Sequence, residues 1–220
     1  MWAVVVAAGA GERFGGRAKQ FELLGGRPVA SWSIEAARSV AGRVVLVVPP
    51  TRTEEPSGDP GPALGADIVV AGGLTRSASV RRGLAVVPPS ATMVVVHDAA
   101  RPLARPALFH AVIDALADDA VDGAICATSV SDTLKRLGTD RVTVAGTVDR
   151  SGLVAVQTPQ AFRADVLRRA HEAGEDATDD AALVEAVGGT VRVVPGDPRN
   201  LKLTVPADLD YAEHLLAEVR

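Results

Sequence analysis

The chain has few of the residues on which several classes of function depend. Of its 220 residues one is a cysteine, Cys126, which excludes an internal disulfide and a metal site built from several cysteines. Aromatic residues make up 3%, so there are few platforms for stacking nucleic-acid bases. The formal net charge is −4, so no overall positive field attracts a polyanion. We therefore expect no nucleic-acid partner, and any anion site has to be built locally.

Long apolar runs are also missing. No uninterrupted apolar segment approaches the length that spans a membrane. The first run, from Trp2 to Ala8, is too short for a signal peptide and has no basic flank. With 47% hydrophobic and 23% charged residues, the composition is that of a globular protein. We expect a single cytoplasmic domain over residues 1–220, with no membrane partner.

Lysine is scarce among the charged residues. Three of the 23 basic residues are lysines, Lys19, Lys135 and Lys202, and the others are arginines. A chain that otherwise uses arginine indicates a need for a compact ammonium group at these positions. Compositional drift is the alternative explanation, and for each lysine taken alone the two are equally supported.

What the sequence does contain is a regular alternation of two patterns. Short apolar runs, typical of buried strands, occupy residues 2–9, 43–48, 67–73, 92–98 and 123–130. Segments with helical spacing lie between or after them, at residues 28–40, 76–87 and 105–119. This alternation predicts an α/β fold with a Rossmann-like, mostly parallel sheet and helices on both faces. Ligands of such sheets bind outside the carboxyl ends of the strands.

Two segments depart from the alternation. Residues 49–67 are rich in Pro, Gly and acidic residues and are predicted to be an exposed connection. Residues 131–156 lack a helical period, and their β-branched content around "LGTDR" predicts a hairpin arm that projects from the sheet. Because a lone hairpin has little core of its own, we expect a second subunit to cover it in a homodimer.

The stretch "VVAAGAGERFGGRAKQF" leads from the first predicted strand into a glycine-rich, basic loop. Its glycines, Gly9, Gly11, Gly15 and Gly16, allow the backbone to bend and approach a ligand closely. Successive backbone N–H groups in such a loop bind anions, and Arg13 and Lys19 add full charges. The spacing matches neither the dinucleotide fingerprint nor the P-loop. A solvated surface loop is the alternative, but the position after the first strand favours a phosphate site.

The second candidate stretch is "VVVHDAARPL". Asp98 follows a buried strand at the same predicted edge, where a carboxylate suits Mg²⁺ bound to substrate phosphates. Arg101 is close enough in sequence to orient Asp98 or to reach a phosphate. The alternative for Asp98 is an N-cap of the following helix. For His97 we favour a structural, hydrogen-bonded histidine.

Further hydroxyl and basic side chains fall in segments predicted to be loops. They are Thr133 and Lys135 in "SDTLK", Arg150 and Thr158 in "TVDRSGLVAVQTPQAF", and Lys202 in "NLKLT". Hydroxyls and guanidinium groups suit a phosphomonoester. The wet face of a hairpin carries the same residue types, so each position alone is a weak indication.

The motifs "AAGAGERFGGRAKQ", "RSASV", "VHDAARP", "DTLKR", "TVDR", "QTPQAF", "TDDA" and "LKLTVPADL" occur in one order across nearly the whole chain. Together they resemble the 2-C-methyl-D-erythritol 4-phosphate cytidylyltransferases of non-mevalonate isoprenoid biosynthesis. Ribitol-5-phosphate cytidylyltransferases share several of these motifs, but the spellings "HDAARP" and "TVDRSGL" favour the methylerythritol enzymes. A homologue that binds CTP without turnover is a third hypothesis.

The resemblance implies that CTP binds with Mg²⁺ and that the phosphate of methylerythritol phosphate attacks its α-phosphorus, displacing pyrophosphate. The residues implied at the phosphates are Arg13, Lys19 and Lys202, with Asp98 at the metal and ribose and Arg101 nearby. The residues implied at the nucleotide are Ala7, Ala8, Gly9, Gly11, Gly73 and Ser79. The residues implied at the acceptor are Thr133 and Arg150, reaching over from a second subunit, and Thr158.

The chain departs from the family pattern at two places. Ala18 stands where the family usually has proline, so we expect a looser loop in which Lys19 orders when CTP binds. The connection at residues 49–67 replaces a more compact turn. Because it lies outside the quoted motifs, we do not expect it to alter the chemistry.

Overall fold

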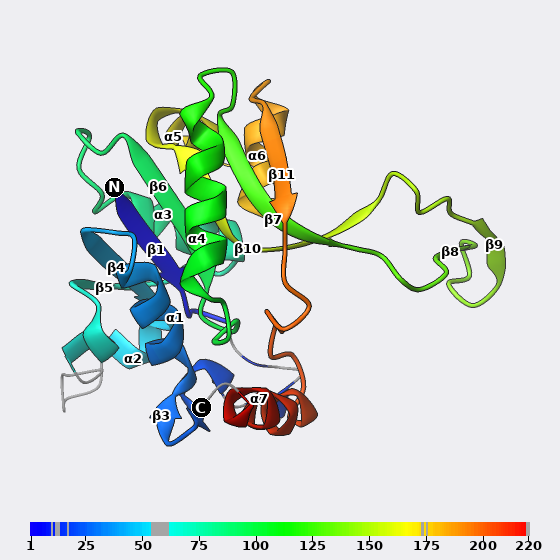
Figure 1. Ribbon diagram of the computed structural model, residues 1–220, viewed down its shortest axis with the longest axis horizontal. Helices are drawn as coiled ribbons and strands as arrows, with labels where there is room; N and C mark the ends of the chain where they lie inside the picture. The colour runs from blue at the N-terminus through cyan, green and yellow to red at the C-terminus, as the bar shows by residue number, and fades with distance from the viewer. Residues whose placement is uncertain are drawn as a thin grey trace.

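A seven-stranded sheet forms the centre of the protein in a computed structural model that describes residues 1–9, 11, 14–16, 18–53, 62–172, 174 and 176–218 (Figure 1). Its strand order is β11-β7-β10-β6-β1-β4-β5. The strands are β1 (Trp2–Val6), β4 (Arg43–Val48), β5 (Ile68–Ala71), β6 (Met93–Asp98), β7 (Gly123–Ser129), β10 (Val154–Arg163) and β11 (Val191–Pro195).

Strand β10 is the exception to the parallel order. It lies between β6 and β7 and runs antiparallel to both, whereas the other pairings in the sheet are parallel. The predicted mostly parallel sheet is therefore confirmed. The prediction that Thr158 lies in a loop is wrong, because it sits inside β10. The pairing register with β7 shifts between Val156 and Gln160, and the Thr158–Pro159 peptide bond is cis.

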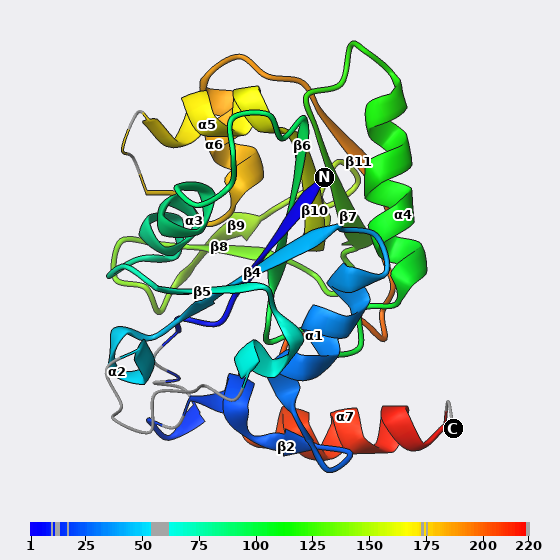
Figure 2. The ribbon, with the colours of Figure 1, turned by 90° about the vertical axis from the view of Figure 1, so that its left-hand side faces the viewer.

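Helices cover both faces of the sheet, as predicted (Figure 2). The helices are α1 (Val29–Arg38), α2 (Pro50–Thr53), α3 (Arg76–Leu84), α4 (Pro106–Asp114), α5 (Ala164–Glu172), α6 (Asp180–Ala186) and α7 (Ala207–Ala217), with 3-10 turns η2 (Lys19–Phe21), η3 (Pro62–Gly65) and η4 (Ala115–Ala117). Helices α1 and α4 lie on one face, and α3, α5 and α6 lie on the other. None of the helices in the described ranges is long and apolar enough to cross a membrane.

Alternate residues of the central strands face opposite helix layers, because side chains alternate along a strand. Ala3 and Val5 of β1 belong to the core cluster that includes residues of α1 and α4. Val4 belongs to the cluster that includes residues of α3, α5 and α6. All three are fully buried, which explains why the strand appears in the sequence as a continuous apolar run.

The carboxyl ends of four neighbouring strands meet at one edge of the sheet. Strands β6, β1, β4 and β5 are adjacent and parallel, so the segments that follow them emerge side by side. A small corner made of β2 (Leu23–Leu24), β3 (Arg27–Pro28) and α7 lies below this edge in Figure 1. There Leu203 is fully buried and its N–H donates to the carbonyl of Ala100 at 2.8 Å. This packing places the neighbouring Lys202 beside the edge.

A long arm projects away from the sheet, as predicted (Figure 1). Its tip is the antiparallel pair of β8 (Lys135–Leu137) and β9 (Val144–Thr147). Large apolar side chains on it are exposed, including Leu137, Val142 and Val144. An isolated two-stranded hairpin is marginal in water, so the tip needs a covering surface.

Gly83 allows α3 to pack closely against the sheet. A Cβ at this position would lie 2.6 Å from Cγ1 of Val4 and 3.1 Å from Cγ2 of Val47. We expect Gly83→Ala to lower the free energy of unfolding by about 1–3 kcal/mol through overpacking, despite the better helix propensity of alanine. Urea unfolding measures this.

Gly152→Ala is the matched control, because a Cβ there meets no atom within 4 Å. We expect it to change the free energy of unfolding by less than about 0.5 kcal/mol. Equal effects of the two substitutions would contradict the close packing of α3.

Candidate functional site

A cleft of about 830 Å³ opens at the carboxyl edge of the sheet. Its walls come from the segments that follow β1, β4, β5 and β6, together with the segment around Lys202. The lining residues are Val6, Ala7, Ala8, Gly9, Gly11, Gly16, Ala18, Lys19, Gln20, Pro49, Pro50, Thr51, Arg52, Gly73, Leu74, Thr75, Arg76, Ser79, Asp98, Ala100, Lys202 and Thr204. The position agrees with the rule for ligands of parallel sheets.

The glycine-rich loop bends as the sequence predicts. Gly11, Gly15 and Gly16 have φ values of 68°, 73° and 77°, a region that favours glycine. Gln20, which the sequence analysis did not single out, holds the start of the loop. Its Nε2 donates to the carbonyls of Ala7 and Gly9, the latter at 3.1 Å. The start of the loop is therefore fixed to the segment that begins η2.

The structure places one of the two cations that were predicted in the loop. Lys19 begins η2 and lines the cleft. Arg13 lies outside the described residues. Ala18 has a φ of −74°, close to the value that proline would impose. The backbone at this departure from the family pattern is therefore already suited to proline.

Small residues let the segment after β5 pack closely against the start of α3. A Cβ on Gly73 would lie 2.5 Å from Cβ of Ala78, so a larger residue does not fit. Ser79 Oγ accepts from the N–H of Gly73 at 3.1 Å and donates to the carbonyl of Thr75 at 2.9 Å. Gly73 and Ser79 line the same cleft as Ala7, Ala8 and Gly9. The structure thus gathers the positions predicted for the base of a nucleotide.

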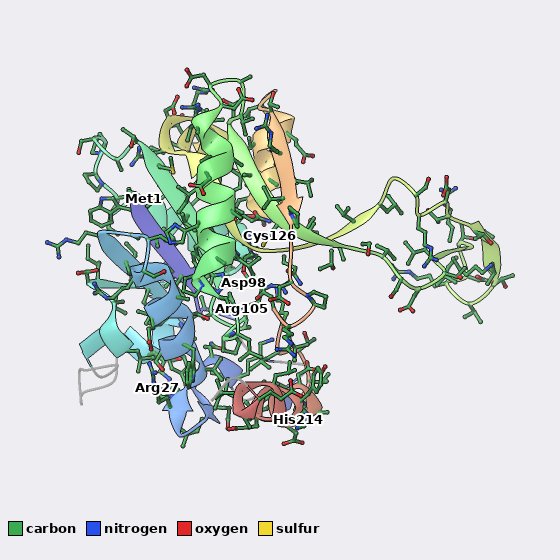
Figure 3. The ribbon with its side chains drawn as sticks, viewed as in Figure 1. Met1, Arg27, Asp98, Arg105, Cys126 and His214 are labelled. Atoms are coloured by element: carbon green, nitrogen blue, oxygen red, sulfur yellow. The ribbon has the colours of Figure 1, made fainter. Side chains whose placement is uncertain are left out.

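Asp98 lies at the end of β6, on the body of the protein and well away from the arm (Figure 3). Its Oδ2 accepts from Lys202 Nζ at 2.6 Å, and its Oδ1 accepts from Arg76 Nε at 3.3 Å. Burial by itself would raise the pKa of Asp98, but Arg76 and Lys202 outweigh it and hold the pKa well below its usual range. Helix α4 begins at Pro106 after Arg105, so Asp98 does not cap it.

Arg76 is a functional candidate that the sequence analysis missed. Its Nη1 donates to Asp180 Oδ2 at 2.8 Å, and Asp180 Oδ1 lies 2.9 Å from Nε2 of His171. Burial by itself would lower the pKa of Arg76, but the two carboxylates raise it. The sequence contained a signal for both residues, because Arg76 and Asp180 belong to the quoted motifs "RSASV" and "TDDA". Their pairing is visible only in three dimensions.

A second pocket of about 360 Å³ adjoins the cleft. Its lining residues are Arg76, Asp98, Arg101, Ile125, Val156, Gln157, Thr158, Gln160, Thr178, Asp179, Ala181, Ala182, Glu185 and Lys202. Arg76, Asp98 and Lys202 line both spaces. Two ligands bound side by side would therefore meet at this charged group.

Thr158 links Asp98 to a buried histidine. The N–H of Asp98 donates to Thr158 Oγ1 at 3.0 Å, and Oγ1 lies 3.1 Å from Nδ1 of His97. Nε2 of His97 lies 3.3 Å from the carbonyl of Arg101. Burial lowers the pKa of His97 to about 4, so the ring is neutral and donates only through Nε2. The structural interpretation of His97 is confirmed.

Arg101 lies near Asp98, as expected, and lines the second pocket with it. Its guanidinium donates to the carbonyls of Asn200, at 2.7 Å, and Val156, at 3.4 Å. It faces the second pocket and is absent from the described residues that line the cleft. Among the described contacts it joins the segment before Lys202 to β10, and burial lowers its pKa.

Thr133 and Arg150 lie on the arm, and the chain does not bring them to its own pockets. Both are exposed, and Nη1 of Arg150 donates to the carbonyl of Val130 at 3.1 Å. Neither belongs to the described residues that line the cleft or the second pocket. A role for them at this kind of site requires a second copy of the chain.

Asp98 is the one carboxylate among the described residues that line the cleft. No group of three or more His, Cys, Asp and Glu side chains in the described ranges could hold a metal ion. A single carboxylate suits Mg²⁺, which keeps several waters and takes phosphate oxygens as its other ligands. The donor set fits a metal that arrives with a nucleotide.

The connection at residues 49–67 reaches the cleft at its start. Its first residues, Pro49 to Arg52, line the cleft. The guanidinium carbon of Arg52 lies 4.2 Å from the centroid of the Phe21 ring. The first part of the connection therefore borders the cleft, and residues 54–61 lie outside the described ranges.

Comparisons with known proteins match the chain along nearly its whole length. The family model of 2-C-methyl-D-erythritol 4-phosphate cytidylyltransferase matches residues 1–218. The protein of that name from Frankia casuarinae is 44% identical over 98% of this chain and 80% of its own. The one from Parasynechococcus marenigrum is 42% identical over 99% and 98%. The crystal structure of the Thermus thermophilus protein is 35% identical, with a TM-score of 0.79 over 97% and 98%.

Gln20 offers a test of how the cleft is supported. It is buried, and Gln20→Leu would leave the carbonyls of Ala7 and Gly9 without this donor. We expect the affinity for CTP to fall about tenfold, since each unpaired buried acceptor is costly. Isothermal titration calorimetry measures this.

Gln157→Leu is the matched control, because Gln157 is also buried and donates to a backbone carbonyl, that of Asp197, beside the second pocket. We expect its affinity for CTP to stay within about twofold of the original. An unchanged affinity in the Gln20 variant would show that the loop does not depend on this contact.

Proposed function

The chain belongs to the 2-C-methyl-D-erythritol 4-phosphate cytidylyltransferase family, and we propose from this premise how its residues carry the reaction. The reaction transfers the cytidylyl group of CTP to 2-C-methyl-D-erythritol 4-phosphate and releases pyrophosphate. The protein is thus a nucleotidyltransferase of isoprenoid precursor biosynthesis. The family match gives no support to ribitol 5-phosphate as the acceptor.

The observation that carries the proposed mechanism is that two pockets meet at Arg76, Asp98 and Lys202. CTP occupies the cleft, with its base against Ala7 to Gly9 and its phosphates toward Lys19. The acceptor occupies the second pocket beside Thr158. Its phosphate is then next to the α-phosphorus of CTP.

The chemistry needs no protein nucleophile. A phosphate oxygen of the acceptor forms a bond to the α-phosphorus of CTP, and the bond from that phosphorus to the bridging oxygen breaks. The electron pair leaves with pyrophosphate. The protein contributes by holding two anions together and neutralising the charge that builds up. Lys19, Lys202 and Arg76 supply positive charge, and Arg13 is assigned to the same task.

We assign the metal ligand to Asp98. A bound Mg²⁺ would supply charge neutralisation at the triphosphate and would take its remaining ligands from phosphate and water. In this structure Oδ2 of Asp98 is in contact with Lys202 Nζ at 2.6 Å, so a metal held by that oxygen would compete with the ammonium group. The retained set of Lys19, Asp98 and Lys202 argues against a homologue that binds CTP without turnover.

We propose a homodimer in which each arm completes the site of the other subunit. The exposed apolar side chains of the arm support this, because they need a cover. The positions of Thr133 and Arg150, away from the pockets of their own chain, support it as well. We also propose a cytoplasmic location, in keeping with a single cysteine that is buried and unpaired.

Pyrophosphate release tests the reaction and the lysines together. We expect release with CTP, Mg²⁺ and methylerythritol phosphate, and none with ribitol 5-phosphate. Lys19→Ala and Lys202→Ala should each lower kcat at least about a hundredfold, as expected for losing a charged contact in the transition state.

Lys135→Ala is the control, since Lys135 lies on the arm and its Nζ contacts Thr147 at 2.6 Å. Its kcat should stay within about threefold of the original. Near-normal turnover of the Lys202 variant would remove that residue from the mechanism, and release with ribitol 5-phosphate alone would reassign the acceptor.

Mixing two inactive variants tests the arm. Lys202→Ala damages the subunit's own site, whereas Arg150→Ala damages the site of its partner. Each mixed dimer then holds one intact site, so an equal mixture should recover about one quarter of the original activity. No recovery, with mixed dimers verified by mass spectrometry, would place Arg150 in the site of its own chain.

A further inference from the structure

The two cations on Asp98 are held in different ways. Arg76 contacts two carboxylates, those of Asp98 and Asp180, and its side chain is 20% exposed. Lys202 contacts Asp98 at 2.6 Å, and its side chain is 43% exposed. Arg76 is therefore the anchored partner of Asp98. Lys202 is more exposed and would give up a single ion pair on moving away.

The anchoring extends beyond one ion pair. Three consecutive residues at the start of α3 contact α6 or the segment that leads into it. Thr75 Oγ1 donates to Asp176 Oδ1 at 2.6 Å, and Ser77 Oγ accepts from the N–H of Ala177 at 3.1 Å. Arg76 lies between them and reaches Asp180. The chain on both sides of Arg76 is thus fixed to the same segment.

Asp180 is itself fully buried. Its second oxygen faces Nε2 of His171, which is also buried, so both carboxylate oxygens have a partner. Burial by itself would raise the pKa of Asp180, but the charge of Arg76 lowers it. A buried ion pair contributes little net stability compared with apolar residues, so its presence beside the pockets points to a task other than stability.

We propose that Asp180 is a positioning residue: it fixes Arg76 against Oδ1 of Asp98 and so directs Oδ2 toward Lys202 and toward the metal that accompanies the nucleotide. This inference rests on the proposed function of the cleft. Because Lys202 occupies Oδ2, a metal held by this oxygen would displace Lys202 from Asp98. The released ammonium group, which lines both pockets, could then turn to the phosphates. Arg76 stays in place and keeps the carboxylate oriented.

A double-mutant cycle separates positioning from stability. Arg76→Gln leaves the buried carboxylate of Asp180 without its cation, and Asp180→Asn leaves Arg76 with Asp98 alone. The double variant removes both charges of the Arg76–Asp180 pair and leaves Asp98 paired with Lys202. We expect each single variant to lower the melting temperature by roughly 10 °C, and the double variant to regain at least about half of the loss. If a single variant does not fold, the double variant is measured alone.

The decisive measurement is CTP affinity with and without Mn²⁺, by calorimetry. The double variant also loses the positive charge of Arg76, so we expect it to bind metal-free CTP more weakly than the original, and the positioning role is measured by the ratio of the two affinities. The gain in affinity on adding Mn²⁺ should fall at least about tenfold, the usual effect of losing a group that orients a metal ligand. A loss of folded protein would instead lower both affinities equally.

The pair of Arg192 and Asp118 provides the control. Their side chains meet at 2.6 Å, are about half exposed and are absent from the described linings of both pockets. Arg192→Gln with Asp118→Asn should leave both CTP affinities unchanged. A double variant of Arg76 and Asp180 that keeps the full Mn²⁺ effect overturns the inference.

A failure of the proposed function can be distinguished from a failure of this inference. Absence of pyrophosphate release by the original protein would remove the reaction, while CTP and Mn²⁺ affinities remain measurable and still decide the role of Asp180. Where turnover is present, kcat of the double variant should stay at least about tenfold below the original despite the regained melting temperature. Recovery of kcat along with stability also overturns the inference.

Discussion

The carboxylate of Asp98, shared between Arg76 and Lys202, is the interaction around which both pockets are arranged. Burial opposes the ionised form of this group, and the two cations restore it. Its place is set by the sheet, because β6 ends there beside β1 and the backbone N–H of Asp98 is held by Thr158 of β10. The cleft and the second pocket share this charged wall, so ligands in both are brought to one point.

A reaction without a protein nucleophile places heavy demands on position. Nucleotidyl transfer is accelerated by aligning the two substrates and by neutralising the charge on their phosphates. Both effects require protein groups that keep their positions during the reaction. The sheet edge provides rigid backbone on one side, and the start of α3 is fixed to the segment before α6 on the other. The exposed Lys202 side chain is the more adaptable part.

Sequence patterns predicted much of the architecture, and what they missed has two separate causes. The alternation of apolar runs and helical spacing was sufficient for the sheet and its two helix layers, since each pattern reports burial within one element. The part of β10 around Thr158 was predicted to be a loop. The register shift interrupts the alternation of apolar and polar residues there, and polar side chains face a pocket. Arg52 was not predicted to line the cleft. Its neighbour Phe21 lies 31 positions away in the sequence, so no local pattern joins the two residues.

Local sequence was sufficient to predict the glycine loop after the first strand, the acidic residue at the end of β6 and the projecting arm, because turns, caps and periodicity depend on neighbouring residues. The packing of distant segments brings Arg76 between Asp98 and Asp180, sets Arg101 against backbone carbonyls, and leaves Thr133 and Arg150 away from the pockets of their own chain. Arg76 and Asp180 are 104 positions apart. A contact at that separation depends on how whole elements pack, and no spacing within the chain records it.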